Sequence, residues 1–269
     1  MTTPQQATAH DGYRAGTDVE PRFVWHDLMT TDLTRARAFY TTLFGWEVRD
    51  QEMGPEIGTY PMIHADGKGI GGIVQKQAGD PSGSQWLPYI AVPDVDATCR
   101  HARTLGGKVE LAPTDIPGVG RFAIVSDRSG AMFCPLTITS GEPGPEGPPK
   151  GIAEWNELLT TDPAGARMFY ETLLGWSSVE QDMGDLGMYT MFAVAENDFV
   201  AGALKMPEDA AATPMWVPYV GTDDVDATAR RVTELGGRIF VPPTDIPDIG
   251  RFSVCGDPTG ATFALYRRG

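Results

Sequence analysis

Two hydrophobic patterns alternate along this chain. Residues 23–29 form a short, mainly apolar run, which predicts a strand. Beyond it, apolar residues recur three and four positions apart, which predicts a helix. Asp32 is placed to cap the first N–H groups of this helix, and Gly45 is placed to end it in a left-handed conformation. The apolar stripe of the helix consists of Ala36, Phe39, Tyr40, Leu43 and Phe44.

Similar patterns predict the rest of the first half. Strand-like runs separated by Gly-rich turns occupy residues 60–65 and 69–75. A strand at 86–92 leads into a second helix, which the DVDAT segment caps and Gly106 ends. Further strands are expected at 108–116, 120–127 and 131–138. A strand–helix–strand–strand–strand module therefore occurs twice, which predicts an α+β fold with curved mixed sheets.

The whole pattern returns 130 residues later. The first pair of matching segments shares 13 of 24 residues, and two further pairs share 12 of 24 each. Three blocks at one offset indicate a gene duplication and two copies of one fold. The pairs are 23–46 with 153–176, 86–109 with 216–239, and 113–136 with 243–266.

The repeat divides the chain into two domains, residues 20–138 and residues 151–269. Residues 139–150 between them are rich in Pro and Gly, so we expect an extended, partly stiff linker. Residues 1–19 have no apolar core, which argues against a signal peptide, and we expect a flexible tail.

Charge and composition narrow the class of protein. The formal net charge of −15 argues against nucleic acid or an anionic membrane as a partner. No apolar stretch approaches the roughly 18 residues that a membrane span needs. Three cysteines without a CxxC pair are typical of a reducing cytoplasm. We therefore expect a cytoplasmic globular protein, monomeric or homodimeric, whose partner is a small molecule.

Three motifs, each present in both copies, carry a family resemblance. They are TTD followed by the FYxTLxGW segment, DVDAT followed by LGG, and GRF followed by an Asp-x-x-Gly-Ala segment. Together they resemble the vicinal oxygen chelate superfamily, which includes glyoxalase I, bleomycin-resistance proteins and extradiol dioxygenases. PTDIPxxGRF in paired domains is similar to two-domain actinobacterial members described as glyoxalase-like or "hydroxylase". The resemblance implies paired β-α-β-β-β modules that form a cup in each domain.

The resemblance also implies where a metal would be held. Metal-dependent members place His or Glu on the first strand, on the strand after the Gly-rich turn, before DVDA and on the last strand. The second of these positions, after the turn, offers Gln75 and Lys205 at best. Neither indole nor aliphatic side chains bind a metal, so we expect no metal site and no cofactor. The other positions fall on Trp25, Leu87 and Cys134, and in the second copy on Trp155, Val217 and Ala264.

The histidines leave one alternative open. His26 is one residue out of register with the ligand position, so strand alternation should turn it to the opposite face of the sheet as a structural residue. If the register slipped by one residue, His26, Asp27 and His64 would form a divalent metal site. The second copy contains no histidine, which argues against the usual metal there.

The remaining cup residues predict an apolar pocket with few polar groups, as small-molecule sites have. A wall of aromatic rings favours a flat or conjugated ligand. Arg121 and Arg251, which follow an identical PTDIP segment, could pair with a carboxylate of the cup or bind an anionic group of the ligand. The expected ligand-binding residues are Trp25, Met29, Leu87, Tyr89 and Arg121, with Trp155, Leu159, Val217, Tyr219 and Arg251 in the second copy.

Asp27 and Glu157 are the candidate catalytic residues. A carboxylate in an apolar cup loses hydration, its pKa rises, and it becomes able to move a proton near neutral pH. The structural alternative is a carboxylate that pairs with an arginine or caps backbone amides. Asp115 and Asp245, which precede Ile-Pro, are expected to stabilise turns.

Four functions remain open on this basis. The first is a metal-independent protein that binds an aromatic small molecule or natural product, in resistance or in specialised metabolism. The second is a metal-free isomerase, lyase or cyclase that uses Asp27 or Glu157 as acid or base. The third is a glyoxalase- or dioxygenase-type metalloenzyme with displaced ligands, and the fourth is a protein-interaction scaffold.

Overall fold

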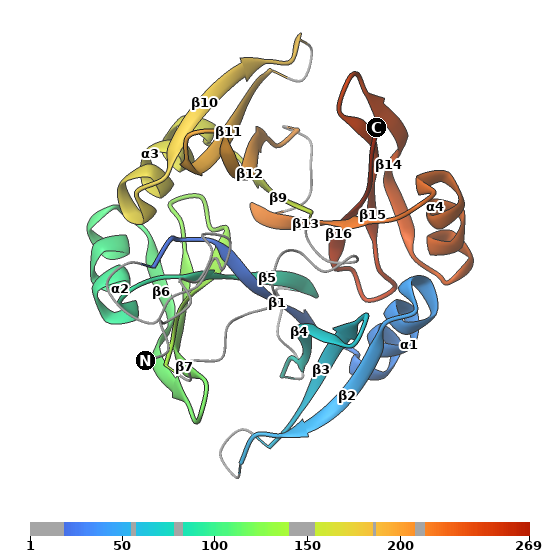
Figure 1. Ribbon diagram of the computed structural model, residues 1–269, viewed down its shortest axis with the longest axis horizontal. Helices are drawn as coiled ribbons and strands as arrows, with labels where there is room; N and C mark the ends of the chain where they lie inside the picture. Colours follow the sequence, from blue (N-terminus) through green and yellow to red (C-terminus); the bar gives the residue numbers. More distant parts are fainter. Residues whose placement is uncertain (1–18, 55–57, 78–82, 140–153, 185–186, 208–212) are drawn as a thin grey trace, which may run out of the picture.

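The computed structural model describes residues 19–54, 58–77, 83–139, 154–184, 187–207 and 213–269 (Figure 1). The predicted tail and linker lie outside these ranges, apart from Val19 and Thr139. Within the described ranges, none of the helices has the length and apolar character needed to span a membrane.

Each copy contributes two helices and eight strands to the described part of the chain. In the first copy they are β1 (Phe23–Thr30), α1 (Leu33–Phe44), β2 (Glu47–Glu52), β3 (Thr59–Ala65), β4 (Lys68–Gln75), β5 (Gln85–Ala91), α2 (Val95–Thr104), β6 (Lys108–Ile116), β7 (Gly120–Ser126) and β8 (Met132–Ile138). In the second copy they are β9 (Trp155–Thr160), α3 (Pro163–Leu174), β10 (Ser177–Asp182), β11 (Met188–Ala195), β12 (Asp198–Lys205), β13 (Met215–Gly221), α4 (Val225–Glu234), β14 (Arg238–Ile246), β15 (Gly250–Gly256) and β16 (Thr262–Arg268).

The two β-α-β-β-β modules predicted for each copy are confirmed, and the first module of each copy contains one strand for which the hydrophobic pattern gave no residue range. The extra strands, β2 and β10, lie at the edges of their sheets and are polar and mostly exposed. An exposed edge strand has no buried face, so its sequence carries no alternation of apolar and polar residues. The α+β fold with two tandem domains of curved sheets stands as predicted.

Local sequence signals set the bounds of the first helix of each copy. The carboxylate of Asp32 accepts a hydrogen bond from the backbone N–H of Arg35 at 3.0 Å, which satisfies a donor that the helix itself leaves free. Gly45 ends α1 with φ of 70°, a conformation that costs glycine little. Asp162 and Gly175 do the same for α3.

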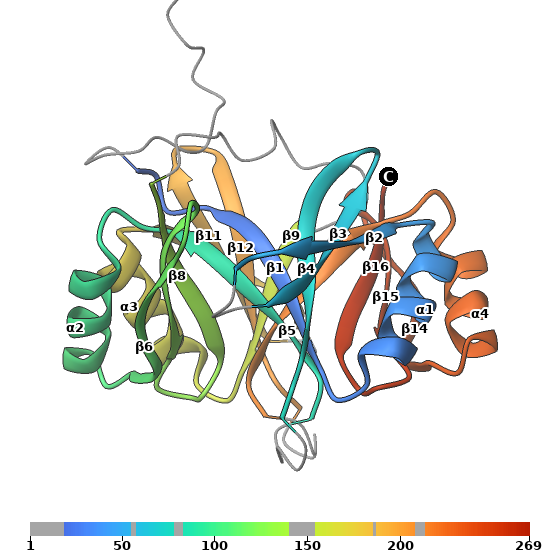
Figure 2. The same ribbon diagram turned by 90° about the horizontal axis from the view of Figure 1, so that it is seen from below.

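In the first copy, pairing of β1 with β5 joins the two modules into one sheet. β1 runs parallel to β4 and antiparallel to β5, which gives the strand order β2-β3-β4-β1-β5-β8-β7-β6. The second copy has the equivalent order, with β9 and β13 at its centre. Both sheets curve, so that the two outer arms lie on either side of the central strands (Figures 1 and 2).

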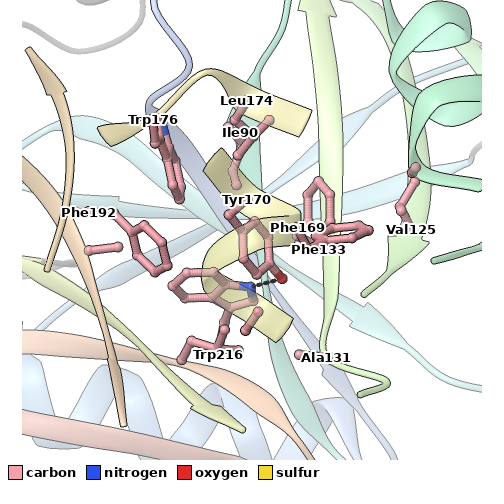
Figure 3. Close-up of a cluster of buried hydrophobic side chains, with 14 of the residues drawn as sticks. Ile90, Val125, Ala131, Phe133, Phe169, Tyr170, Leu174, Trp176, Phe192 and Trp216 are labelled. Atoms are coloured by element: carbon pink, nitrogen blue, oxygen red, sulfur yellow. Dashed lines mark hydrogen bonds between the residues drawn. The ribbon is translucent and has the colours of Figure 1, made fainter. Parts of the chain in front are cut away.

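The helices of one copy pack against those of the other. One hydrophobic core combines α1 and its sheet with α4 and its sheet, and a second combines α2 with α3. Figure 3 shows the second core, in which Phe133 of the first copy lies beside Tyr170 of the second. The modules therefore pair within a copy through the sheet and across copies through the helices.

At the interface between the copies, two residues at equivalent positions of the repeat form a hydrogen bond with each other. Nε2 of His26 and Oδ1 of Asn156 are 2.7 Å apart, and both side chains are buried. The imidazole also stacks on the ring of Phe23. His26 thus lies on the helix side of its sheet as a structural residue, as strand alternation predicted.

Candidate functional site on the concave faces

Each sheet has a face turned away from its helices, which we call the concave face. In the first copy a separate cluster of side chains covers it, built around Leu87, Tyr89, Cys134 and Leu136. Trp25 and Met29 of β1 pack against this cluster, as expected from their position two residues either side of Asp27. In the second copy the equivalent cluster contains Val217, Tyr219 and Ala264, with Trp155 and Leu159 against it.

Asp27 lies at the centre of the first concave face and accepts hydrogen bonds from three side chains. The Tyr60 hydroxyl donates to its Oδ1 at 2.5 Å, and the indole N–H of Trp25 donates to the same oxygen at 3.1 Å. The Tyr89 hydroxyl donates to Oδ2 at 2.8 Å. The carboxylate is only 4% exposed. Neutral donors, and not a cation, therefore satisfy this buried acid.

Glu157 holds the same position in the second copy, with fewer donors. The Tyr219 hydroxyl donates to its Oε1 at 2.9 Å, and the Tyr189 hydroxyl donates to Oε2 at 3.0 Å. The indole N–H of Trp155 donates to the Tyr189 hydroxyl at 2.9 Å. As a residue, Glu157 is partly exposed, whereas Asp27 is almost completely buried.

Burial changes the acidity of both carboxyl groups. Loss of hydration raises the pKa of Asp27, and the hydrogen bonds from Tyr60, Tyr89 and Trp25 oppose this rise. Burial likewise raises the pKa of Glu157 against the two bonds from Tyr219 and Tyr189. A carboxyl group whose pKa moves upward from its ordinary value becomes a better proton acceptor near neutral pH.

A glycine on the neighbouring strand makes room for each tyrosine. Gly72 of β4 lies opposite Asp27 in the parallel register, and a Cβ there would overlap the Tyr60 hydroxyl. Gly202 occupies the same place beside Glu157, where a Cβ would overlap the Tyr189 hydroxyl. The phenol reaches the carboxylate only because this position of the strand has no side chain.

The donors on the first concave face do not match a metal site. Trp25 faces Tyr89 across the antiparallel pair, and Asp27 faces Leu87, so a single carboxylate stands among donors and apolar groups. Burial raises the pKa of the Cys134 thiol well above its ordinary value, whereas a metal would require the thiolate. Within the described ranges no three His, Cys, Asp or Glu side chains converge on one point.

The alternative set of His26, Asp27 and His64 is not assembled. His26 lies on the helix side of the sheet, bonded to Asn156, whereas Asp27 lies on the concave face. His64 bonds through Nδ1 to the carbonyl of Met62 on its own strand at 3.2 Å. Gln75, the last residue of β4, turns its side chain to the start of α1, where its amide oxygen accepts a hydrogen bond from the N–H of Leu33.

Arg121 and Arg251 do not pair with Asp27 or Glu157, which corrects that expectation. The Arg121 guanidinium contacts Asp96 of α2 and Asp115 of β6, each at 2.7 Å. Arg251 forms the equivalent pairs with Asp226 and Asp245 in the second copy. Alternation along β7 turns Arg121 toward α2, and its neighbour Phe122 packs on the concave face instead.

Sequence reasoning missed Tyr60 and Tyr189, each of which donates a hydrogen bond to one of the two carboxylates. Each is the second residue of a strand whose burial alternates, so the signal for its face was present in the Y-x-M pattern. The two tyrosines are 129 residues apart instead of 130, which takes them out of the alignment that defines the repeat. The pairing of β3 with β4, and of β4 with β1, then brings them to the acids.

Comparison with known proteins identifies the family. A profile of the "Glyoxalase/Bleomycin resistance protein/Dioxygenase superfamily" matches residues 22–134 and 152–265. The chain is 34% identical over 257 residues to "Putative glyoxylase CFP32" of Mycobacterium tuberculosis, with 95% of this chain and 96% of that protein covered. It is 33% identical over 254 residues to "Anthracycline biosynthesis protein DauV" of Streptomyces sp. (strain C5), with 90% and 91% covered.

Solved structures share the fold at low sequence identity. The Mn(II)-bound glyoxalase from Novosphingobium aromaticivorans gives a TM-score of 0.61 at 17% identity, with 91% of this chain and 82% of that chain covered. The 2,2',3-trihydroxybiphenyl 1,2-dioxygenase from Sphingomonas wittichii gives 0.64 at 13% identity, with 91% and 90% covered. The matching profile spans both copies, and the relatives align along almost the whole chain. This chain is therefore a member of the glyoxalase/bleomycin resistance protein/dioxygenase superfamily.

Proposed function

We propose that the protein binds a small aromatic or conjugated organic molecule on its concave faces and does so without a resident metal ion. The observation that carries the proposal is the chemistry of the positions where metal-dependent relatives are expected to hold their ligands. Trp25, Leu87 and Cys134 occupy them in the first copy. Indole and aliphatic side chains provide no lone pair for a metal, and burial raises the pKa of the Cys134 thiol, which disfavours the thiolate that a metal requires. These side chains do provide an apolar surface.

The rings around each carboxylate support a flat ligand. Trp25, Tyr60 and Tyr89 surround Asp27 in the first copy, and their hydroxyl and indole groups are held by hydrogen bonds. Rings fixed in this way present apolar faces and lose little conformational freedom when a ligand stacks on them. Two relatives, DauV and DnrV, are named for anthracycline biosynthesis, which supports a role in specialised metabolism.

Two measurements test this proposal on the purified full-length chain. Elemental analysis by mass spectrometry should find no stoichiometric Zn, Ni, Mn or Fe; one equivalent per copy would overturn the proposal in favour of a metalloenzyme. Titration with polycyclic aromatic ligands should quench tryptophan fluorescence. Trp25→Phe combined with Trp155→Phe removes the two concave-face indoles and should abolish most of the quenching, whereas core tryptophans such as Trp216 remain as an internal reference.

A second candidate function is metal-free acid–base catalysis at the same carboxylates. It is favoured by the raised pKa values of Asp27 and Glu157 and by their neutral hydrogen-bond partners. Such a group accepts a proton from a weakly acidic C–H or O–H of the ligand and returns it elsewhere on the molecule, as an isomerase or cyclase requires. Asp27→Asn and Glu157→Gln should each abolish turnover of a ligand at the concave face that carries it. Unchanged turnover in both variants would exclude the two carboxylates as the catalytic acid or base.

A further inference from the structure

The carboxylates of Asp27 and Glu157 differ in the number of hydrogen bonds that they accept within the protein. Asp27 receives three side-chain hydrogen bonds, and a backbone bond from Gly72 also stabilises its charged form. A carboxylate has about four acceptor positions. Since Asp27 is also almost completely buried, its capacity for hydrogen bonds is used within the protein.

Glu157 retains acceptor capacity that Asp27 lacks. Within the described part of the chain its hydrogen-bond donors are the hydroxyls of Tyr189 and Tyr219. Trp155, which corresponds to Trp25, donates to Tyr189 and not to the acid. Two acceptor positions of the Glu157 carboxylate are therefore not used by these donors, and the residue is partly exposed where Asp27 is almost completely buried.

The side chain on the last strand beside the buried tyrosine also differs between the copies. Cys134 is paired with Tyr89 in the parallel register of β5 and β8, and its thiol is fully buried there. Ala264 takes the equivalent place beside Tyr219 on β16. Replacing a thiol with a hydrogen leaves a smaller side chain under the tyrosines. The longer side chain of Glu157 and the smaller side chain of Ala264 together distinguish the second concave face from the first.

We propose that Glu157 is the ligand-contacting carboxylate of this protein, and that it selects a ligand with a hydrogen-bond donor, an ammonium or hydroxyl group, on an aromatic body. Asp27 in turn is a positioning residue, which orients Tyr60 and Tyr89. An anionic ligand is disfavoured at Glu157, because the carboxylate repels like charge. This inference rests on the proposed binding of an aromatic molecule. It adds which polar group the ligand carries and which copy of the repeat contacts that group.

The experiment uses the full-length chain and three probes with the same ring system. These are 9-(aminomethyl)anthracene, 9-anthracenemethanol and 9-methylanthracene, with binding followed by energy transfer from tryptophan. The wild type should bind one or both donor-bearing probes at least about ten-fold more tightly than 9-methylanthracene, as a hydrogen bond to a charged acceptor provides. Comparison of the amine with the alcohol then shows which donor is preferred.

Substitutions assign the selectivity to one copy. Glu157→Gln should remove the preference while 9-methylanthracene still binds, and Glu157→Asp, the first copy's side chain, should reduce it. Asp27→Asn should change the affinities for all three probes in the same proportion, because it acts through the tyrosines. Glu234→Gln, on the surface of α4, is the matched control for the loss of one charge. Thermal unfolding of each variant confirms that it is folded.

Two failures are distinguishable. If none of the three probes binds the wild type, the proposed binding of aromatic molecules is wrong. If all three bind but the preference for a donor is absent, survives in Glu157→Gln or disappears only in Asp27→Asn, the assignment to Glu157 is overturned and the proposed function stands.

Discussion

Burial of His26 at the interface between the copies makes the stability of the protein depend on pH. His26 is buried on the helix side of β1, where Nε2 and the Asn156 amide oxygen are 2.7 Å apart. Burial lowers the pKa of His26 from 6.5 to about 4, and the bond to Asn156 only partly opposes this. We expect His26→Gln to abolish this dependence, because the glutamine amide can take the place of Nε2 and does not titrate.

The sign and the size follow from linkage. A histidine with a depressed pKa binds fewer protons in the folded state than in the unfolded state, so its contribution is fully present above pH 6.5. That contribution is lost as the pH falls from 6.5 toward 4. Each pKa unit corresponds to about 1.4 kcal/mol, so the wild type should lose up to roughly 3 kcal/mol relative to His26→Gln over this interval. Near pH 7 the variant should be about 1 kcal/mol less stable, because it loses the stacking of the imidazole on Phe23.

Chemical denaturation followed by tryptophan fluorescence, repeated between pH 7.5 and pH 4, measures this difference. Burial also raises the pKa of carboxyl groups such as Asp127, but these groups are present in both proteins and their effects cancel when the two are compared. His101→Gln, on the exposed surface of α2, is the control and should follow the wild type. A difference between wild type and His26→Gln that stays constant within about 0.5 kcal/mol across this range would refute the reasoning.

Two further predictions concern the concave face and the interface. Gly72→Ala should displace the Tyr60 hydroxyl and lower the free energy of unfolding by about 2–4 kcal/mol, measured by denaturation, because the new Cβ overlaps the phenol; a change below about 0.5 kcal/mol would show that the tyrosine has room to move. Residues 19–138 expressed alone should form a homodimer or aggregate, because both hydrophobic cores combine residues of the two copies. Size-exclusion chromatography with light scattering tests this, and a folded monomer would contradict it.

Local signals were sufficient for the elements and for the faces of the central strands. The capping residues Asp32 and Gly45 act within a few residues of the helix ends, so their role is written in the adjacent sequence. Alternation along β1 likewise placed Asp27 on one face and His26 on the other, since the side-chain period of a strand is fixed by the backbone. The polar edge strands β2 and β10 were missed because solvent covers them on both faces.

The partners of the carboxylates required the tertiary structure. Tyr60 reaches Asp27 through the pairing of three strands, and Arg121 pairs with Asp96 across the gap between α2 and β7. Neither contact is between near neighbours in sequence. The one-residue shift between the copies also concealed the equivalence of Tyr60 and Tyr189.

The sequence by itself determined the duplication and the α+β modules, because these depend on residue identity and on patterns that span a few turns or strands. Only the tertiary structure decided that the helices pack across the copies and that tyrosines satisfy the two buried acids. The apolar stripe of a helix needs a surface to pack against, and a buried carboxylate needs hydrogen-bond donors. The local sequence shows these needs, but it does not show which distant part of the chain meets them.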